Sequence, residues 1–229
     1  MMKRFSLAAA ALLILSACGS SHASSYTYNL NTTINGDTAS GVPSATIEDT
    51  GLNMVRITMS LVGTPAAQFI DTWLFNFNGT QTDLNNLTFT YSGTSTGHSA
   101  DTIGKAVDGF GNNNTPGFGN NSSGLMDISF NFPSAQANRF NGGEVVVYDV
   151  TTSGASLSAS LFNVTSAPTF DANGPYYTAA HVQGIPGAQS GAMGANTFTA
   201  VPEPSSVVLG LIGAAGLGVL GFRRRPTVA

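Results

Sequence analysis

The chain has 229 residues, of which 9% are charged, and a formal net charge of −4 at pH 7. Most of its basic residues lie at the two ends, so residues 24–200 keep three basic residues against eleven acidic ones, a net charge of −8. A segment of this charge repels a phosphate backbone, which argues against nucleic acid as a partner. Asn, Thr, Ser and Gly must then supply the polar surface, a composition common in exported β proteins.

The first 23 residues have the pattern of a secretory signal peptide. Two basic residues precede an apolar run over 5–15, and small residues follow. Cleavage after Ala23 fits the small-x-small rule. A competing pattern, Leu-Ser-Ala-Cys ending at Cys18, resembles a bacterial lipobox in which Cys18 would be lipidated, and this alternative stays open. Cys18 is the only cysteine, so a product cleaved after Ala23 has no disulfide.

Short segments in which apolar and polar residues alternate predict β-strands between 24 and 183. The clearest is 55–61, where Val55, Ile57, Met59 and Leu61 share one face. The run over 145–150 is apolar at consecutive positions, which predicts a strand covered on both faces. The other predicted strands lie at 26–30, 70–77, 87–91, 126–132, 157–161 and 176–182.

Many short strands with Gly/Asn turns and almost no helix predict an all-β fold, an antiparallel β-sandwich with a jelly-roll-like strand order. Trp73 stands in an aromatic row with Phe75 and Phe77 at strand spacing. This position favours a core residue over a platform for sugar binding.

A long Gly/Asn-rich loop is predicted over 92–124. Its oxygen-bearing side chains make calcium the one cofactor to consider, although their spacing fits no EF-hand loop. Solvated loop residues are the simpler interpretation, so we expect no cofactor. The calcium candidates are Asp101, Asp108, Asn112 and Asn114.

The sequence offers little for an enzyme mechanism. Gly97–Asp101 resembles a degraded nucleophile elbow around Ser99, but no helical pattern follows it. Only His98 and His181 remain after signal removal, and two histidines without cysteine argue against a zinc site. We therefore expect a protein that is not an enzyme, with a hydrolase using Ser99 and His98 as a minor alternative.

The C-terminus has the features of a membrane segment. After a predicted linker over 184–200, two prolines precede an uncharged run over 205–222. As a helix this run covers about 27 Å, close to a hydrocarbon core of about 30 Å. The basic residues after it should stay in the cytoplasm, which places the preceding domain on the far side of the membrane. This stop-transfer cluster consists of Arg223, Arg224 and Arg225.

A proline-glutamate-proline box, a Gly/Ala/Leu/Val helix and terminal arginines in this order resemble the PEP-CTERM sorting signal of Gram-negative bacteria. The resemblance covers 201–225. It implies recognition by an exosortase, a membrane-embedded cysteine protease/transpeptidase, and release or transfer of the domain to the cell surface, often in bacteria that make exopolysaccharide. The box consists of Val201, Pro202, Glu203 and Pro204.

These features predict four parts: a signal peptide at 1–23, an exported β-sandwich at 24–183, a linker at 184–200 and a sorting signal at 201–225. We expect a surface or extracellular-matrix protein with a structural or adhesive role, anchored by its C-terminal helix until it is processed. The alternative is a module that binds carbohydrate, such as exopolysaccharide, with calcium as a possible aid.

Overall fold

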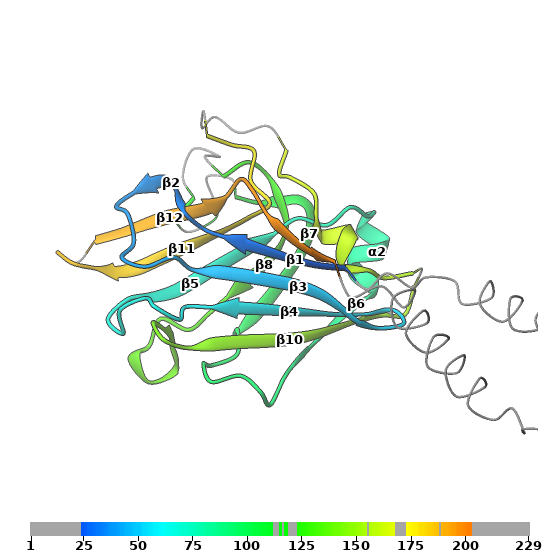
Figure 1. Cartoon of the computed structure of the whole chain (residues 1–229), viewed down its shortest axis with the longest axis horizontal. Coiled ribbons are helices and arrows are strands. Elements are labelled where there is room, and N and C mark those ends of the chain that lie inside the picture. The colour runs from blue at the N-terminus through cyan, green and yellow to red at the C-terminus, as the bar shows by residue number, and fades with distance from the viewer. Residues whose placement is uncertain are drawn as a thin grey trace, which may run out of the picture. The chain divides into compact units, whose positions relative to one another are not determined.

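Two antiparallel β-sheets pack face to face in the computed structural model of the chain (Figure 1). The structure describes residues 24–202 except for 112–114, 116, 119–122, 155, 168–172 and 188. Residues of both sheets contribute to one buried core, which includes Ile47 and Ile57 from one sheet and Trp73 and Phe130 from the other. The all-β sandwich predicted from the sequence is therefore confirmed, while its likeness to a jelly roll stays a prediction.

The first sheet, sheet A, has six strands in the order β13-β1-β3-β4-β10-β6. Its neighbouring strands are far apart in the sequence, except for the β3–β4 hairpin. The strands of sheet A are β1 (Ser24–Asn29), β3 (Ser44–Gly51), β4 (Met54–Ser60), β6 (Leu87–Tyr91), β10 (Val145–Thr152) and β13 (Thr199–Pro202).

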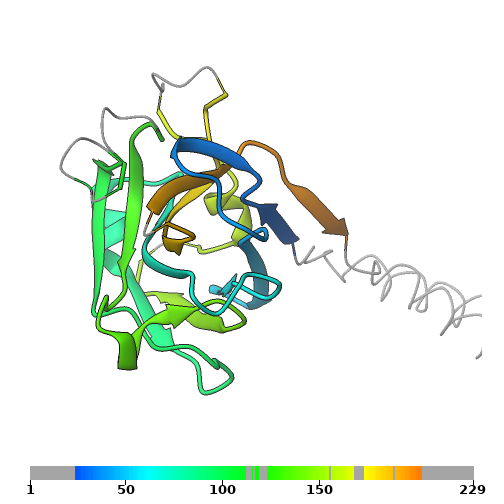
Figure 2. The same cartoon turned by 90° about the vertical axis from the view of Figure 1, so that its left-hand side faces the viewer.

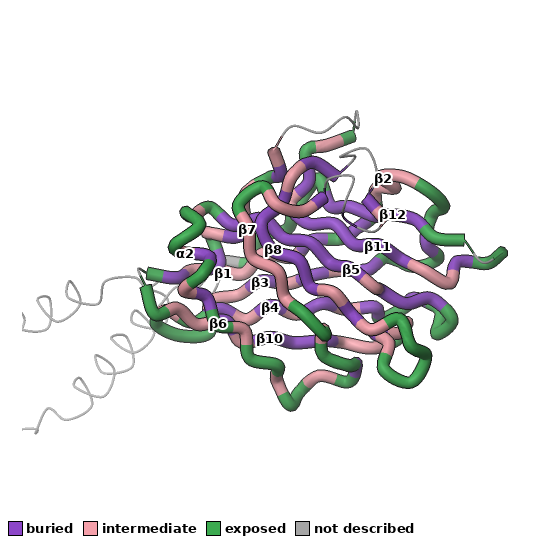
Figure 3. Tube along the Cα trace, turned by 180° about the vertical axis from the view of Figure 1, so that it is seen from behind, coloured by how far each residue is buried: buried purple, intermediate pink, exposed green. Residues whose placement is uncertain are grey.

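The second sheet, sheet B, has the order β2-β12-β11-β5-β8-β7, and a short strand, β9, pairs with β5 beyond the end of β8. Figure 3 shows sheet B from outside, with buried residues concentrated in β5, β8 and β11. Its strands are β2 (Thr32–Gly36), β5 (Phe69–Phe75), β7 (Thr102–Phe110), β8 (Met126–Asn131), β9 (Phe140–Asn141), β11 (Thr178–Ile185) and β12 (Gln189–Ala195).

Alternation of apolar residues positions the core as predicted. In β4, Val55, Ile57 and Met59 are fully buried, and the polar residues between them are half-buried. In β5, Trp73 is fully buried and its ring stacks with those of Phe75 and Phe140. Because a strand turns successive side chains to opposite faces, the period of two is sufficient to sort these residues.

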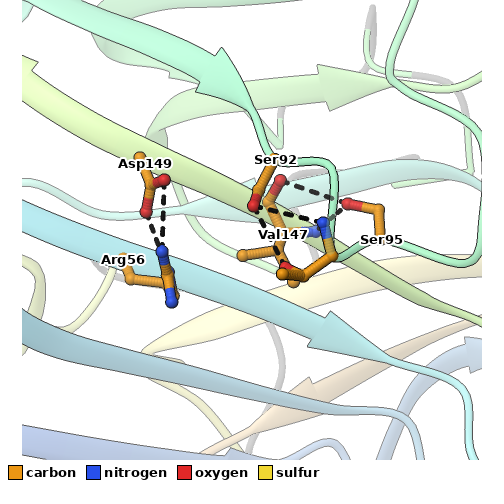
Figure 4. A network of polar contacts seen from close by, with 6 residues as sticks. Arg56, Ser92, Ser95, Val147 and Asp149 are labelled. Atoms are coloured by element: carbon orange, nitrogen blue, oxygen red, sulfur yellow. Dashed lines mark hydrogen bonds and ion pairs between the residues drawn. The ribbon is translucent and has the colours of Figure 1, made fainter.

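β10 is covered on both faces, as its consecutive apolar residues predict: Val146, Val147 and Tyr148 are all buried. After β6 the chain continues along β10. The Ser92 N–H donates to the Val147 carbonyl at 2.9 Å, and the Val147 N–H donates to Ser95 Oγ at 3.0 Å (Figure 4). The segment that begins at Ser92 thus connects β6 of sheet A to β7 of sheet B.

On the outer side of β4 and β10, Arg56 and Asp149 form a bidentate ion pair at 2.8 and 3.2 Å (Figure 4). Both side chains are about one-third exposed. Exposed pairs of this kind contribute little to stability, typically below about 1 kcal/mol.

Among the described residues, three short helices interrupt the strands: α2 (Gln81–Asn86), η2 (Gln136–Asn138) and η3 (Ala159–Phe162). α2 begins with a capping box in which the Thr80 and Asp83 side chains bond each other's backbone N–H groups. η3 replaces the strand predicted over 157–161, so that prediction is wrong. Its apolar residues Ala159 and Phe162 are buried from the turns of a 3₁₀ helix instead of from alternate strand positions.

The predicted loop over 92–124 contains β7, so the loop is shorter than expected. β7 pairs only with β8, and each of its residues is half-buried or exposed. The ladder is also interrupted between Lys105 and Phe110. An edge strand that buries neither face has no need for alternating apolar residues, which explains why the pattern missed it.

The predicted linker over 184–200 is wrong, because this segment contains the end of β11, all of β12 and part of β13. The domain therefore extends past residue 183, and its contacts form one compact unit over Ser24–Val201. β12 is rich in glycine and alanine, and at Gly191 its backbone lies close to that of Asp37. A Cβ on Gly191 would lie 1.9 Å from the Asp37 carbonyl oxygen.

Candidate functional site

The sorting signal begins inside the folded domain. β13 lies at the edge of sheet A beside β1, and both are seen together in Figure 1 and Figure 2. Val201, the first residue of the predicted box, is 51% exposed on this strand, and Pro202 is its last residue. A proline is tolerated in an edge strand because its missing N–H need not face a neighbour.

A terminal aromatic cluster holds the chain just before β13. The Phe198 ring packs edge-on against the rings of Tyr26 and Tyr177, with centroids 5.5 and 5.1 Å apart. Tyr28, which is buried, lies next to both Tyr177 and Phe198. These contacts tie the last residues before the sorting box to β1 and to the start of β11.

The rest of the predicted sorting signal lies outside the described residues, as does the predicted signal peptide over 1–23 with Cys18. No helix in the described part of the chain is long and apolar enough to cross a membrane. The predicted helix over 205–222 lies outside the described residues. The box and stop-transfer residues outside the described part are Glu203, Pro204, Arg223, Arg224 and Arg225.

A β-sandwich that ends at a Pro-Glu-Pro box, before an uncharged run and an arginine cluster, has the layout of an exported protein sorted through its C-terminus. The family model of the PEP-CTERM protein-sorting motif matches residues 200–225. The chain thus carries this motif, which confirms the resemblance and marks the protein as exported and sorted through an exosortase. Neither the curated proteins nor the solved structures contain a match to the chain.

A cleft of about 490 Å³ opens between β6 and β7, the edge strands that end the two sheets on one side of the sandwich. Phe89 and Tyr91 line it from β6, and Ile103 and Lys105 line it from β7. Its volume lies within the range of about 300–1,000 Å³ that is typical of ligand sites. The structure brings Ser99, the predicted nucleophile of the minor alternative, to this cleft.

His98 and His181, the two histidines after residue 23, lie in different surroundings. His98 is exposed next to Ser99, whereas His181 is buried on β11 and its Nδ1 lies 2.8 Å from Asp71 Oδ1. Gln183 Nε2 donates to the other oxygen of Asp71. Among the described residues, no hydrogen bond joins a serine hydroxyl to either histidine.

Gly117 lies against the His181 ring, where a side chain would not fit. Its φ is +81°, a conformation that glycine adopts without strain, and a Cβ there would lie 2.1 Å from His181 Cγ. The Phe118 ring packs edge-on near the same histidine, with centroids 6.4 Å apart. The described part of the Gly/Asn-rich segment thus covers the Asp71–His181 pair.

The calcium candidates are not brought together by the part of the chain that the structure describes. Asp101 precedes β7 and Asp108 lies near its other end, while Asn112 and Asn114 lie outside the described residues. Within 24–202, less the gaps given above, no group of three or more His, Cys, Asp or Glu side chains could hold a metal ion.

Asp127 is a buried carboxylate that accepts hydrogen bonds from backbone N–H groups. It is 8% exposed on β8 and accepts hydrogen bonds from the backbone N–H groups of Phe77 and Asp108, each at 2.8 Å. Burial raises the pKa of this carboxyl. The two N–H groups act against that rise, and the nearby Asp108 carboxylate adds to it.

We expect Asp127→Asn to change how stability depends on pH. Because its pKa is raised in the folded protein, Asp127 takes up a proton on acidification before the unfolded chain does. Its contribution to the free energy of unfolding therefore increases as the pH falls through the raised pKa, and Asp127→Asn loses this gain. Urea unfolding of both proteins from pH 7 down to about pH 2.5 measures the difference.

Asp83→Asn is the matched control for this pH series, with the opposite sign. Hydrogen bonds from Thr80 lower the pKa of the Asp83 carboxyl, so its contribution is present at neutral pH and is lost as the pH falls through that lowered pKa. A difference between wild type and Asp127→Asn that stays constant with pH would contradict the assignment of Asp127.

The sequence offers Ser99 and Asp101 as candidates for different sites, a nucleophile and a calcium ligand, and does not indicate Tyr91 or Lys105 as site residues. Tyr91 continues the alternation of Leu87 and Phe89, which favours a core position, although it is 39% exposed. Lys105 fell within the predicted loop. One feature of the sequence could have drawn attention to Lys105 as a site residue: it is one of only three basic residues in 24–200.

Proposed function

We propose that this chain is a non-enzymatic surface or matrix protein with a structural or adhesive role. A signal peptide over 1–23 exports it, the helix over 205–222 holds it in the membrane, and an exosortase then processes it. The observation that supports this best is the position of the sorting motif, which starts on β13. Cleavage after the box would leave every strand of the sandwich in the product.

The test of this proposal is the mass of the mature protein in a host with and without the cognate exosortase. We expect the exosortase to shorten the chain near the box and the signal peptidase to leave Ser24 as the first residue. Membrane fractions of the host without the enzyme should retain the full C-terminus. An intact C-terminus in both hosts would refute processing, and a lipidated Cys18 would replace the first cleavage site with the lipobox.

A second candidate function is carbohydrate binding, which the cleft between β6 and β7 favours. It combines a partly exposed aromatic ring with hydroxyl, carboxylate and ammonium groups. Sites of this composition orient a ligand by a few polar groups and bury its less polar faces.

A further inference from the structure

The cleft between β6 and β7 presents a fixed aromatic ring to solvent. The Tyr91 ring packs edge-on against that of Tyr148, with centroids 5.6 Å apart, and its hydroxyl donates to the Gly97 carbonyl. Tyr148 is buried and accepts a hydrogen bond from the Ala100 N–H at 2.7 Å. A ring held from two sides loses little conformational entropy when a ligand stacks on it.

Polar groups stand at both ends of this cleft. Near Tyr91, Ser99 and Asp101 are exposed, and in the described structure their side chains make no hydrogen bond. At the other end, Lys105 Nζ donates to the carbonyls of Asn85 and Leu87 at 3.1 and 2.9 Å. An ammonium group has three N–H donors, so one remains for a ligand.

The length of the cleft favours an elongated ligand. Asp101, directly before β7, and Lys105 on β7 are four residues apart, which corresponds to about 13 Å in an extended chain. The apolar side chains of Phe89 and Ile103 lie between these ends and are half-buried. A ligand that lies along the cleft would therefore contact an aromatic ring, apolar side chains and polar groups that can bond to hydroxyl groups.

The charges of the cleft favour a neutral ligand. One carboxylate and one ammonium line it, at opposite ends. Residues 24–200 carry a net charge of −8, which disfavours an anionic polymer at any exposed site. A neutral chain rich in hydroxyl groups matches Ser99, Asp101 and Lys105 without requiring an excess of either charge.

A polypeptide strand is a poorer fit. Strand addition needs a row of free backbone groups, but β6 has only five residues and its first carbonyl, that of Leu87, already accepts from Lys105. A lysine on an edge strand is also a usual means of preventing added strands. The free edge of β6 is therefore short and partly blocked.

We propose that the β6–β7 cleft binds an extended neutral polysaccharide, with Tyr91 stacked on a sugar ring and Asp101 and Ser99 bonded to its hydroxyl groups. This inference deepens the proposed surface role, on which it rests, by naming a ligand class and its site. Asp101 is the only acid among the cleft-lining residues, so the binding does not require calcium.

The experiment measures binding of the full-length protein, purified in detergent, to immobilised neutral gluco-, manno- and galacto-oligosaccharides. Anionic oligosaccharides and an alternating Val-Thr peptide are included. We expect binding to at least one neutral series, unchanged by EDTA. Tyr91→Ala should weaken it roughly tenfold and Tyr91→Phe less than twofold, because the ring and not the hydroxyl makes the contact.

Asp101→Asn is a second variant that does not depend on the packing of Tyr91. It should weaken binding about threefold to tenfold, as expected for loss of a hydrogen bond to a charged group. Asp37→Asn, an exposed aspartate on another part of the surface, is the matched control and should bind as wild type.

Three results would overturn the inference: no binding to any neutral oligosaccharide, binding only to the peptide or the anionic series, or wild-type affinity in both cleft variants. A chain that is processed by the exosortase but binds no saccharide would refute the cleft and leave the proposed sorting and surface delivery standing. A chain that binds saccharide but keeps its C-terminus would do the reverse.

Discussion

Replacing Trp73 with alanine is expected to lower the free energy of unfolding by about 3–5 kcal/mol. Trp73 is fully buried in β5, and its ring stacks on Phe75 and Phe140 with centroids 6.2 and 6.3 Å away. The substitution removes these contacts and leaves a cavity between the sheets. Urea unfolding followed by far-UV circular dichroism measures the effect, because Trp73 is the only tryptophan for fluorescence.

Two further variants separate packing from hydrogen bonding. Trp73 Nε1 donates to Thr178 Oγ1 at 2.9 Å, and this hydroxyl donates to the Leu74 carbonyl at 2.6 Å. Trp73→Phe keeps much of the packing and loses only the first bond, so its cost should be intermediate. Leu52→Ala, at a residue that is 96% exposed, should cost less than about 0.5 kcal/mol. Equal costs for Trp73→Ala and Leu52→Ala would contradict the core position.

Replacing Glu203 with glutamine is expected to slow exosortase processing by roughly 30-fold or more. This estimate takes the carboxylate as the one charged contact of the box, and loss of one partner of a buried charge pair costs about 2–5 kcal/mol. Glu203 follows Pro202, the last residue of β13, so the enzyme meets it directly after the sandwich. The rate is the fraction of chain shortened over time, measured by mass spectrometry in a host with the exosortase.

Glu48→Gln is the control for this experiment. It removes the same charge from β3, where Glu48 pairs across the sheet with Arg56 and lies outside the sorting motif. We expect it to be processed at the wild-type rate. If Glu48→Gln is processed as slowly as Glu203→Gln, the effect comes from net charge and not from the box.

Two of the buried strands were predictable from the sequence. β4 follows the alternation of its apolar residues and buries one face, and β10 follows its consecutive ones and is covered on both faces. β5 departs from the alternation, because Leu74 is buried on the face opposite to Trp73. The sorting motif was also recognisable, since a proline box, an apolar run and an arginine cluster carry their information in adjacent residues.

Segments whose structure depends on their neighbours were missed. β7 is an edge strand without a fully buried face. β12 contains many small residues, and the backbone of β2 lies close to it. In neither segment does the local pattern of apolar residues differ from that of a loop. The 3₁₀ helix at Ala159–Phe162 shows the converse, because alternating apolar residues over 157–161 predict a strand where none forms.

The sequence by itself determined that this protein is exported and sorted through its C-terminus, and that its domain is a β-sandwich. Both follow from local order along the chain. Only the tertiary structure decided which strands end the sheets, and hence that Tyr91 of β6 and Lys105 of β7 line one cleft and that the sorting motif starts on β13. Strand order depends on backbone pairing between residues far apart in the chain, such as β10 with β4 and β6, and periodicity along one strand carries no record of its partner.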